Sequence, residues 1–228
     1  MSRLVVASLN IHWGQDGRAL DVLDADLVLL QEVWAAAGED PLAEAARARG
    51  YEVSRAVLVE RADLVGRRLD VARARVPGTW GLAVLHRAGP ARQRVVPLGH
   101  APADAERAVQ VVDLPHGGET VRVANLHLTH RFPLALGQLR RALEATAAGD
   151  GDRPTVVAGD ANLPRRLVRP GPGLAPAVRG ATFPSGRPVV QFDHVLVSRH
   201  WAVESATITP DVGSDHRGVR AVLRRTDV

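Results

Sequence analysis

The chain has 228 residues, of which 46% are hydrophobic and 24% are charged. This length fits one large domain or two small ones, and the apolar content is sufficient for a core, which excludes a disordered chain. No apolar run approaches the roughly 18 residues of a membrane-spanning helix, and no charged-then-apolar leader precedes the first strand. We therefore expect a cytoplasmic protein with no transmembrane segment.

The chain contains no cysteine, which excludes disulfides and thiolate metal sites. Any metal must be held by carboxylate, amide or imidazole groups, and these favour a hard ion such as Mg²⁺. The formal net charge is +4, and all 29 basic residues are arginines. So complete a bias indicates codon preference, and the basicity is only a weak indication of nucleic-acid binding.

The first two apolar segments each end in polar side chains. Residues 4–13 are typical of a strand, and Asn10 and His12 share one face at its carboxyl end. After a short helical pattern, residues 25–34 form a second apolar strand that closes with Glu32. Because a buried, unpaired carboxylate is costly, Glu32 requires a cation, a metal or water as a partner. The alternatives are ordinary loop roles for Asn10 and His12 and a solvent-facing Glu32.

The next part of the chain predicts covering structure. Asp40 and Pro41 begin an amphipathic helix that ends at Gly50. The strands expected after it cover 51–59, 79–87, 95–97 and 108–114. Between the first two, residues 61–75 are charged and irregular, and are interpreted as a solvated arm or a substrate-facing loop.

Residues 120–130 alternate, so that His127 lies on the polar face of a strand. A single strand histidine is more often a hydrogen-bonded core group than a catalytic one. Residues 131–133 then open a helix that runs from 134 to 147.

A buried strand over residues 154–158 stops at Gly159, where the backbone turns. Asp160 and Asn162 follow at spacing i, i+2, and on extended chain they point the same way. They would stand together at the end of a sheet. The alternative is an Asx-turn in which both only satisfy loop amides.

The last third contains two further polar signals. Residues 165–188 are rich in proline, glycine and arginine, and indicate a long ordered loop because strands resume after it. The strand predicted over 189–198 contains Asp193, a residue disfavoured in strands, so we expect a buried hydrogen bond from a histidine. Asp215 and His216 precede the closing strand, 219–223, and would point to opposite sides, toward a metal and a water respectively.

Together these motifs resemble the endonuclease/exonuclease/phosphatase superfamily, over nearly the whole chain from Leu4 to Leu223. They occur in the family's order: Asn10, Gln31-Glu32, His127, Gly159-Asp160-Ala161-Asn162, Asp193 and Ser214-Asp215-His216. The resemblance implies one domain over residues 1–228, a four-layer α/β/β/α sandwich. Two mixed sheets pack face to face with helices outside, and the catalytic groups gather at one edge.

The resemblance also implies the role of each site residue. Glu32 is the principal Mg²⁺ ligand, with Asn10 beside it and Asp215 available to the same or a second ion; Mn²⁺ is an alternative metal. His216 is the base, oriented by Asp193. Asp160 and Asn162 position the attacking water and a phosphoryl oxygen, and His127 stabilises the transition state or protonates the leaving oxygen. The predicted substrate-binding residues are His12, which shares a face with Asn10, and Arg131.

The reaction expected from this set is metal-dependent hydrolysis of a phosphodiester by in-line attack of water. Nucleic acid is the leading substrate class, because arginines of 61–75 and 165–169 would flank the site, although aromatic residues form only 4% of the chain. The alternatives are a phosphatase or phosphodiesterase acting on a small phosphorylated metabolite or a lipid head group, and a non-catalytic binding module. We expect a monomer.

Overall fold

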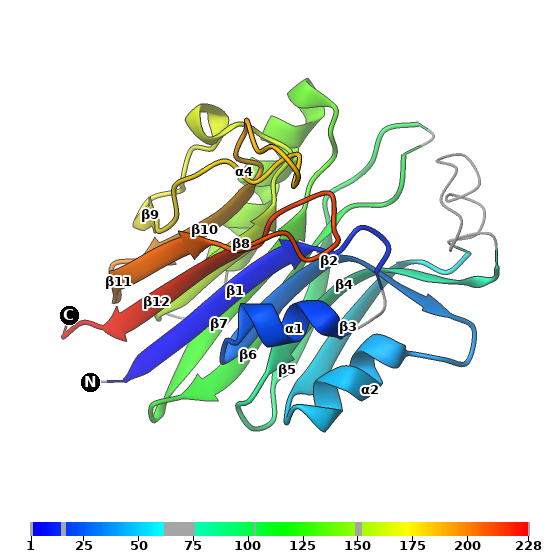
Figure 1. Cartoon of the computed structure of the whole chain (residues 1–228). Helices are drawn as coiled ribbons and strands as arrows, with labels where there is room; N and C mark the ends of the chain where they lie inside the picture. Colours follow the sequence, from blue (N-terminus) through cyan, green and yellow to red (C-terminus); the bar gives the residue numbers. More distant parts are fainter. Residues whose placement is uncertain (1, 15–16, 62–75, 103, 149–151, 228) are drawn as a thin grey trace.

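The computed structural model describes residues 2–14, 17–61, 76–102, 104–148 and 152–227. Two six-stranded mixed sheets pack face to face, and helices cover their outer faces (Figure 1). This confirms the predicted four-layer α/β/β/α sandwich. None of the helices in the described part of the chain is long and apolar enough to span a membrane.

The first sheet has the strand order β11-β12-β1-β2-β4-β3. Its β1 and β2 are parallel, and the other pairs are antiparallel. The strands are β1 (Arg3–Asn10), β2 (Leu27–Ala36), β3 (Glu52–Val59), β4 (Gly78–His86), β11 (Trp201–Ile208) and β12 (Val219–Arg225).

The second sheet has the order β5-β6-β7-β8-β10-β9, with β7 and β8 as its parallel pair. Its strands are β5 (Arg92–Pro97), β6 (Ala108–His116), β7 (Glu119–His127), β8 (Thr155–Asp160), β9 (Leu174–Pro176) and β10 (Asp193–Ser198). In each sheet the parallel pair lies near the centre, so the ends of several strands meet at one edge.

Three α-helices in the described part of the chain supply the outer layers. α1 (Arg18–Leu23) and α2 (Pro41–Ala48) pack on the first sheet, and α4 (Phe132–Ala147) packs on the second. The α2 start follows the prediction, because the Asp40 side chain accepts a hydrogen bond from the Ala43 amide at 3.0 Å. A short 3-10 turn, η3 (Arg165–Leu167), follows β8.

The apolar core between the sheets is crossed by a buried polar bridge close to the active-site edge. Gln31 Nε2 donates to Asn125 Oδ1 at 2.7 Å, and Asn125 Nδ2 donates to the Leu30 and Ala83 carbonyls at 3.0 and 3.1 Å. Gln31 and the two carbonyls belong to the first sheet, and Asn125 to the second. A buried amide without these partners would be costly, so the bridge favours a single register of one sheet over the other.

The structure corrects the prediction of a strand over 189–198. β10 begins only at Asp193. Val189 lies in a loop beside an isolated bridge between Phe183 and Val190, and 75% of its surface is exposed. β11, an edge strand, has no predicted counterpart because most of its residues are exposed and give no alternating pattern. The charged stretch 62–75 lies outside the described residues.

Candidate active site

Three adjacent strands of the second sheet bring His127, Asp160 and Asp193 into line. Asp160 in β8 is the direct partner of His127 in β7 and of Asp193 in β10. Gly159 allows β8 to lie close to β7, because a Cβ there would be 2.0 Å from the Leu126 carbonyl oxygen and its φ is +145°. The sequence therefore needs glycine immediately before Asp160.

The first sheet contributes Asn10 and Glu32 to the same edge. Asn10 ends β1, whereas Glu32 lies where the pairing of β2 with β4 shifts between Leu30 and Val33. Such a bulge re-aims one side chain, and Glu32 has the uncommon φ of +55°. Asn10 Nδ2 donates to Glu32 Oε1 and to Asp160 Oδ2, each at 3.1 Å, so it joins carboxylates from the two sheets.

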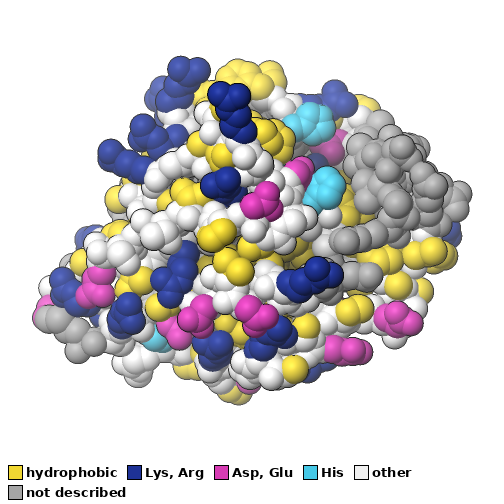
Figure 2. Space-filling view, in the orientation of Figure 1, with side chains coloured by type: hydrophobic (Ala, Val, Ile, Leu, Met, Phe, Trp, Pro, Cys, Tyr) yellow, Lys and Arg dark blue, Asp and Glu magenta, His cyan; other side chains and the backbone are white. Residues whose placement is uncertain are grey.

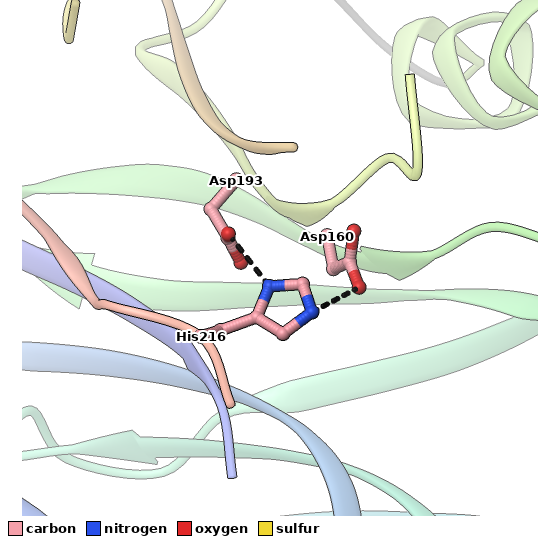
Figure 3. Close-up of side chains that lie close together, drawn as sticks. All are labelled: Asp160, Asp193 and His216. Carbon is pink, nitrogen blue, oxygen red and sulfur yellow. Dashed lines mark hydrogen bonds and ion pairs between the residues drawn. The ribbon is translucent and has the colours of Figure 1, made fainter. Parts of the chain in front are cut away.

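His216 lies between two carboxylates (Figure 3). Its Nδ1 is 2.9 Å from Asp193 Oδ2, the buried hydrogen bond expected for this carboxylate, and its Nε2 is 3.7 Å from Asp160 Oδ2. Burial of the ring opposes protonation, but the hydrogen bond to Asp193 and the charge of Asp160 outweigh it and raise the pKa of His216 to about 9. One face of the ring lies against Phe183, with ring centroids 4.9 Å apart.

Two carboxylates at this edge, Asp160 and Glu32, are held in an environment that disfavours their charge. Burial, followed by repulsion from Asp193, raises the pKa of Asp160 to about 7. Burial also raises the pKa of Glu32. Asp193 Oδ1 is buried and has no hydrogen-bond partner in the described part of the chain. A site that contains several such groups is arranged for a cation or for proton transfer.

Asn162 lies beside Asp160, but through a turn and not through extended chain. Its amide donates to Asp160 Oδ1 at 2.8 Å in an Asx-turn, and its φ is +49°. Its Nδ2 donates to the Leu128 carbonyl at 2.9 Å and is 3.4 Å from Asp160 Oδ2. The Asx-turn itself therefore places the side chains of Asp160 and Asn162 next to each other at the site.

His12 and Asp215 form the solvent-facing rim of the site. His12 Nδ1 is 3.1 Å from Asp215 Oδ1, and about half of each side chain is exposed. The hydrogen bond to Asp215 raises the pKa of His12, although partial burial opposes this. Arg131 is exposed, and its side chain has no contact with the site residues in the described part of the chain.

Arg107 is a site residue that the sequence did not reveal. It directly precedes β6 and is only 7% exposed, and its Nη1 lies 3.0 Å from Nδ1 and 3.1 Å from Nε2 of His127. Asp104 holds the guanidinium at 3.1 Å, and the Trp80 ring lies 5.4 Å from it. Burial and then the Arg107 charge lower the pKa of His127 well below its usual range, so this imidazole is neutral. The only signal in the sequence was an arginine beside a buried strand.

The donor atoms at the junction of the sheets suit a hard divalent cation. His127 Nε2 lies 3.7 Å from Glu32 Oε1 and 3.6 Å from Asp160 Oδ2, the two oxygens that Asn10 Nδ2 joins. Asn10 Oδ1 accepts from the His12 amide at 3.0 Å, so ligation by Asn10 requires its oxygen in the place of Nδ2. Asp160, Asp193 and His216 also have ligand atoms within 4.8 Å of one another. The Glu32–Asp160 oxygens suit a hard ion better, because it prefers oxygen and both His216 nitrogens face carboxylates.

Comparison with solved structures identifies the same fold in several proteins. An endonuclease/exonuclease/phosphatase protein from Beutenbergia cavernae is similar with a TM-score of 0.73 and 24% identity, over 99% of this chain and 72% of that one. A second, from Bacteroides vulgatus, gives 0.72 and 17% identity, over 99% and 100%. D. rerio TDP2, in complex with a single-strand DNA product, gives 0.71 and 15% identity, over 98% and 100%.

No curated protein matches the sequence. The family model described as "Endonuclease/Exonuclease/phosphatase family" matches residues 7–216, which extend from β1 to His216 and include every group gathered at the active-site edge and its rim. The chain therefore belongs to the endonuclease/exonuclease/phosphatase family of metal-dependent phosphoric ester hydrolases.

Proposed function

We propose that this protein is a Mg²⁺-dependent nuclease, which hydrolyses phosphodiester bonds of nucleic acid by in-line attack of water. The observation that supports it most directly is the position of His216. Its Nδ1 is bound to Asp193, and its Nε2 is directed toward Asp160 (Figure 3). Asp160 Oδ2 in turn accepts a hydrogen bond from Asn10, the amide that also donates to Glu32.

In this proposal His216 is the general base. The Asp193 carboxylate accepts a hydrogen bond from Nδ1–H, which fixes the tautomer and leaves Nε2 to take a proton from water. Asp160 and Asn162 orient that water and a phosphoryl oxygen. Glu32 and Asp160, with Asn10, would hold the metal, and Asp215 adds an oxygen at the rim. The bound metal would supply positive charge against the phosphoryl oxygens.

His127 can protonate the leaving oxygen, the second role expected for it, only if its imidazole is protonated. The contact with Arg107 opposes protonation of the ring. A guanidinium can only donate, and Arg107 Nη1 lies within hydrogen-bond distance of both ring nitrogens, so at least one of them carries no proton. We infer that neutral His127 stabilises the transition state through its remaining N–H. Arg107 adds a fixed positive charge behind it, where negative charge develops on the leaving oxygen.

Nucleic acid is supported as the substrate by the loops beside the site. Arg165, Arg166 and Arg187 are exposed, and they have no ion-pair partner in the described part of the chain. Arginine side chains gather over the upper part of the face shown in Figure 2, where the segments that follow β8 lie (Figure 1). Phe183, partly exposed beside His216, offers a ring on which a base can stack. TDP2, which has this fold, was solved with a DNA product.

The test is a set of cleavage assays with Mg²⁺ on single-stranded DNA, duplex DNA, RNA, sphingomyelin, phosphoinositides and bis-nitrophenyl phosphate, with His216→Ala as the inactive control. We expect cleavage of a nucleic acid and of the simple diester, and loss of both with EDTA. Hydrolysis of a lipid alone, or of the simple diester alone, would reject the proposal that the protein is a nuclease, but would still show that it is a phosphoesterase. The absence of any His216-dependent turnover would favour a binding module.

The arginines give a second, independent readout. The double variant Arg165→Gln/Arg166→Gln removes two expected phosphate contacts, which should reduce the slope of log K against log salt by about 1.4 for single strands. The double variant Arg47→Gln/Arg92→Gln, which removes the same charge from exposed positions on α2 and β5, should leave that slope unchanged. Equal slopes for both double variants would contradict binding of the backbone at this face.

A further inference from the structure

A cavity of about 800 Å³ lies away from the active site, between α4 and the segment that contains η3 and β9. Small-molecule sites in proteins are typically about 300–1,000 Å³, so this volume is large enough for a ligand. Thr155 and Ser198, at the ends of β8 and β10 opposite to the active site, also line it. Asp160 is five residues further along β8, which places the two sites about 17 Å apart.

Five leucine side chains, from α4 and from the facing segment, form apolar parts of the cavity walls. α4 buries Leu139 against the second sheet, and Leu136 and Leu143, seven residues apart on one line of the helix, face the cavity. Leu167 and Leu174 lie opposite to them. Leu136 is 39% exposed, although a helix that covers a sheet normally presents polar side chains away from it. The cavity therefore offers apolar surface to a ligand.

The rim has an excess of positive charge. Five arginines line the cavity, Arg122, Arg140, Arg153, Arg169 and Arg199, and three carboxylates pair with them, Asp113, Glu144 and Asp152. Arg122 and Arg153 share Asp113. Arg169 is exposed and has no ion-pair partner in the described part of the chain. Among the described residues the arginines at the cavity outnumber the carboxylates that pair with them, and the guanidinium of Arg169, which pairs with none of these carboxylates, favours a ligand with an acidic group.

We propose that this cavity is a second ligand site, and that it takes a long-chain amphiphile with one anionic head group, such as a fatty acid. The hydrocarbon chain covers the leucines of α4 and the facing segment, and the head group meets Arg169 at the rim. A nucleic acid is a poorer match, because no aromatic side chain lines the cavity for a base to stack on.

The test uses cis-parinaric acid, a fatty acid whose fluorescence rises in an apolar environment, with the full chain. We expect one saturable site, from which palmitate displaces the probe, whereas hexadecanol and acetate do not. Leu136→Asp and Arg169→Gln should each weaken binding about tenfold, which corresponds to about 1.4 kcal/mol. The matched variants Val22→Asp, at an equally exposed helix position on α1, and Arg47→Gln should bind as the wild type does.

His216→Ala should bind the probe normally, which separates this site from catalysis and from the nuclease proposal. If hexadecanol displaces the probe as well as palmitate does, the site does not require an anionic head group, and that part of the proposal is rejected. The proposal as a whole is rejected if no saturable binding occurs, or if all four surface variants bind alike while melting at the wild-type temperature.

Discussion

The imidazole of His216 touches a carboxylate on each side, and its protonation state is the first property of a single residue to test. A base acts in its neutral form, so activity should rise as the pH passes through the His216 pKa, which is about 9 before metal binds. A cation near Asp160 disfavours the imidazolium and should move this pKa downward.

The variant Asp193→Asn should lower both the rate and the pKa of His216. The asparagine removes the negative charge, and with it the charge-assisted hydrogen bond, that raise the pKa, so the acidic limb of the pH profile should move to lower pH. Loss of orientation should reduce kcat by about 10²–10⁴. The measurement is kcat/KM against pH on bis-nitrophenyl phosphate with saturating Mg²⁺. Asp227→Asn, at an exposed position, is the control, and an unmoved acidic limb would show that Asp193 does not orient the base.

The variant Arg107→Met should reduce kcat by about 10²-fold with a much smaller change in KM, because it removes a charge that acts on the transition state. The pKa of His127 should rise when the Arg107 cation is lost, and it should stay below its usual range because the ring remains buried. NMR titration of His127 measures this directly. Arg92→Met removes an exposed arginine and should change neither quantity; a wild-type kcat for Arg107→Met would limit Arg107 to packing.

Sequence reasoning reached some of these residues for identifiable physical reasons. A carboxylate predicted inside a strand needed a partner, and Asp193 does bind His216. Arg107 was not found because Asp104, Trp80 and His127, which hold it, are brought together only by the fold. Arg131 was placed among the substrate-binding residues, and in the structure it is exposed with no contact to the site, so that role remains a prediction.

Among the elements, β8 depends on the absence of a side chain at Gly159. The variant Gly159→Ala should separate β7 from β8, because the new Cβ would meet the Leu126 carbonyl at 2.0 Å and the φ of +145° is unfavourable for alanine. We expect a loss of about 1–3 kcal/mol or more in the free energy of unfolding. For a chain of this size that corresponds to a fall of roughly 2–12 °C in Tm.

The control for this variant is Gly137→Ala in α4, where an added Cβ has no neighbour within 4 Å. Alanine is favoured over glycine in a helix, so this variant should be more stable by about 0.5–1 kcal/mol. Thermal unfolding measures both. If Gly159→Ala melts at or above the wild-type temperature, β7 and β8 must tolerate a wider separation than the structure indicates.

The elements also show where sequence patterns were insufficient. The helix over 134–147 was expected from its apolar spacing, and α4 matches it within two residues at its start. The predicted beginning of β10 was wrong. The apolar residues Val189 and Val190 belong to the loop before the strand, where their backbone amides donate hydrogen bonds to the Phe183 carbonyl. Apolar character alone could not distinguish a strand from a turn that follows a neighbouring loop.

For the whole molecule, the four layers followed from the resemblance and not from periodicity, because the sequence does not specify which strands are neighbours. The orders β11-β12-β1-β2-β4-β3 and β5-β6-β7-β8-β10-β9 join segments far apart in the chain. The gathering of the polar motifs at one edge depends on these orders. Without them, each polar strand end remained compatible with an ordinary loop.

A divalent metal should stabilise the whole fold if Glu32 is its ligand. At 100 times its Kd, the metal should add about 2.7 kcal/mol to the free energy of unfolding. This corresponds to a rise of about 5–11 °C in Tm for a chain of this size. In Glu32→Gln that rise should be lost. Scanning calorimetry with and without Mg²⁺ at pH 8 measures it, and Glu39→Gln, at an exposed position, should keep the full rise.

The metal-free form of Glu32→Gln should melt no lower than the wild type. Burial raises the pKa of Glu32 in the folded state, so ionisation of this carboxyl costs stability as the pH rises from the unfolded-state pKa to the raised folded-state pKa, and glutamine removes this cost. A wild-type response to Mg²⁺ in Glu32→Gln would place the metal on other ligands.

The side-chain amide of Asn10 donates a hydrogen bond to one carboxylate of each sheet. The rate of hydrolysis therefore depends on the position of one sheet relative to the other. A sideways slip of one half by a single residue, about 3.3 Å, would part Glu32 from Asp160 while leaving every strand paired within its own sheet. On gentle heating or in dilute denaturant, activity should therefore be lost before β-structure is lost. The hydrolysis rate then reports whether the two sheets keep their native register relative to each other.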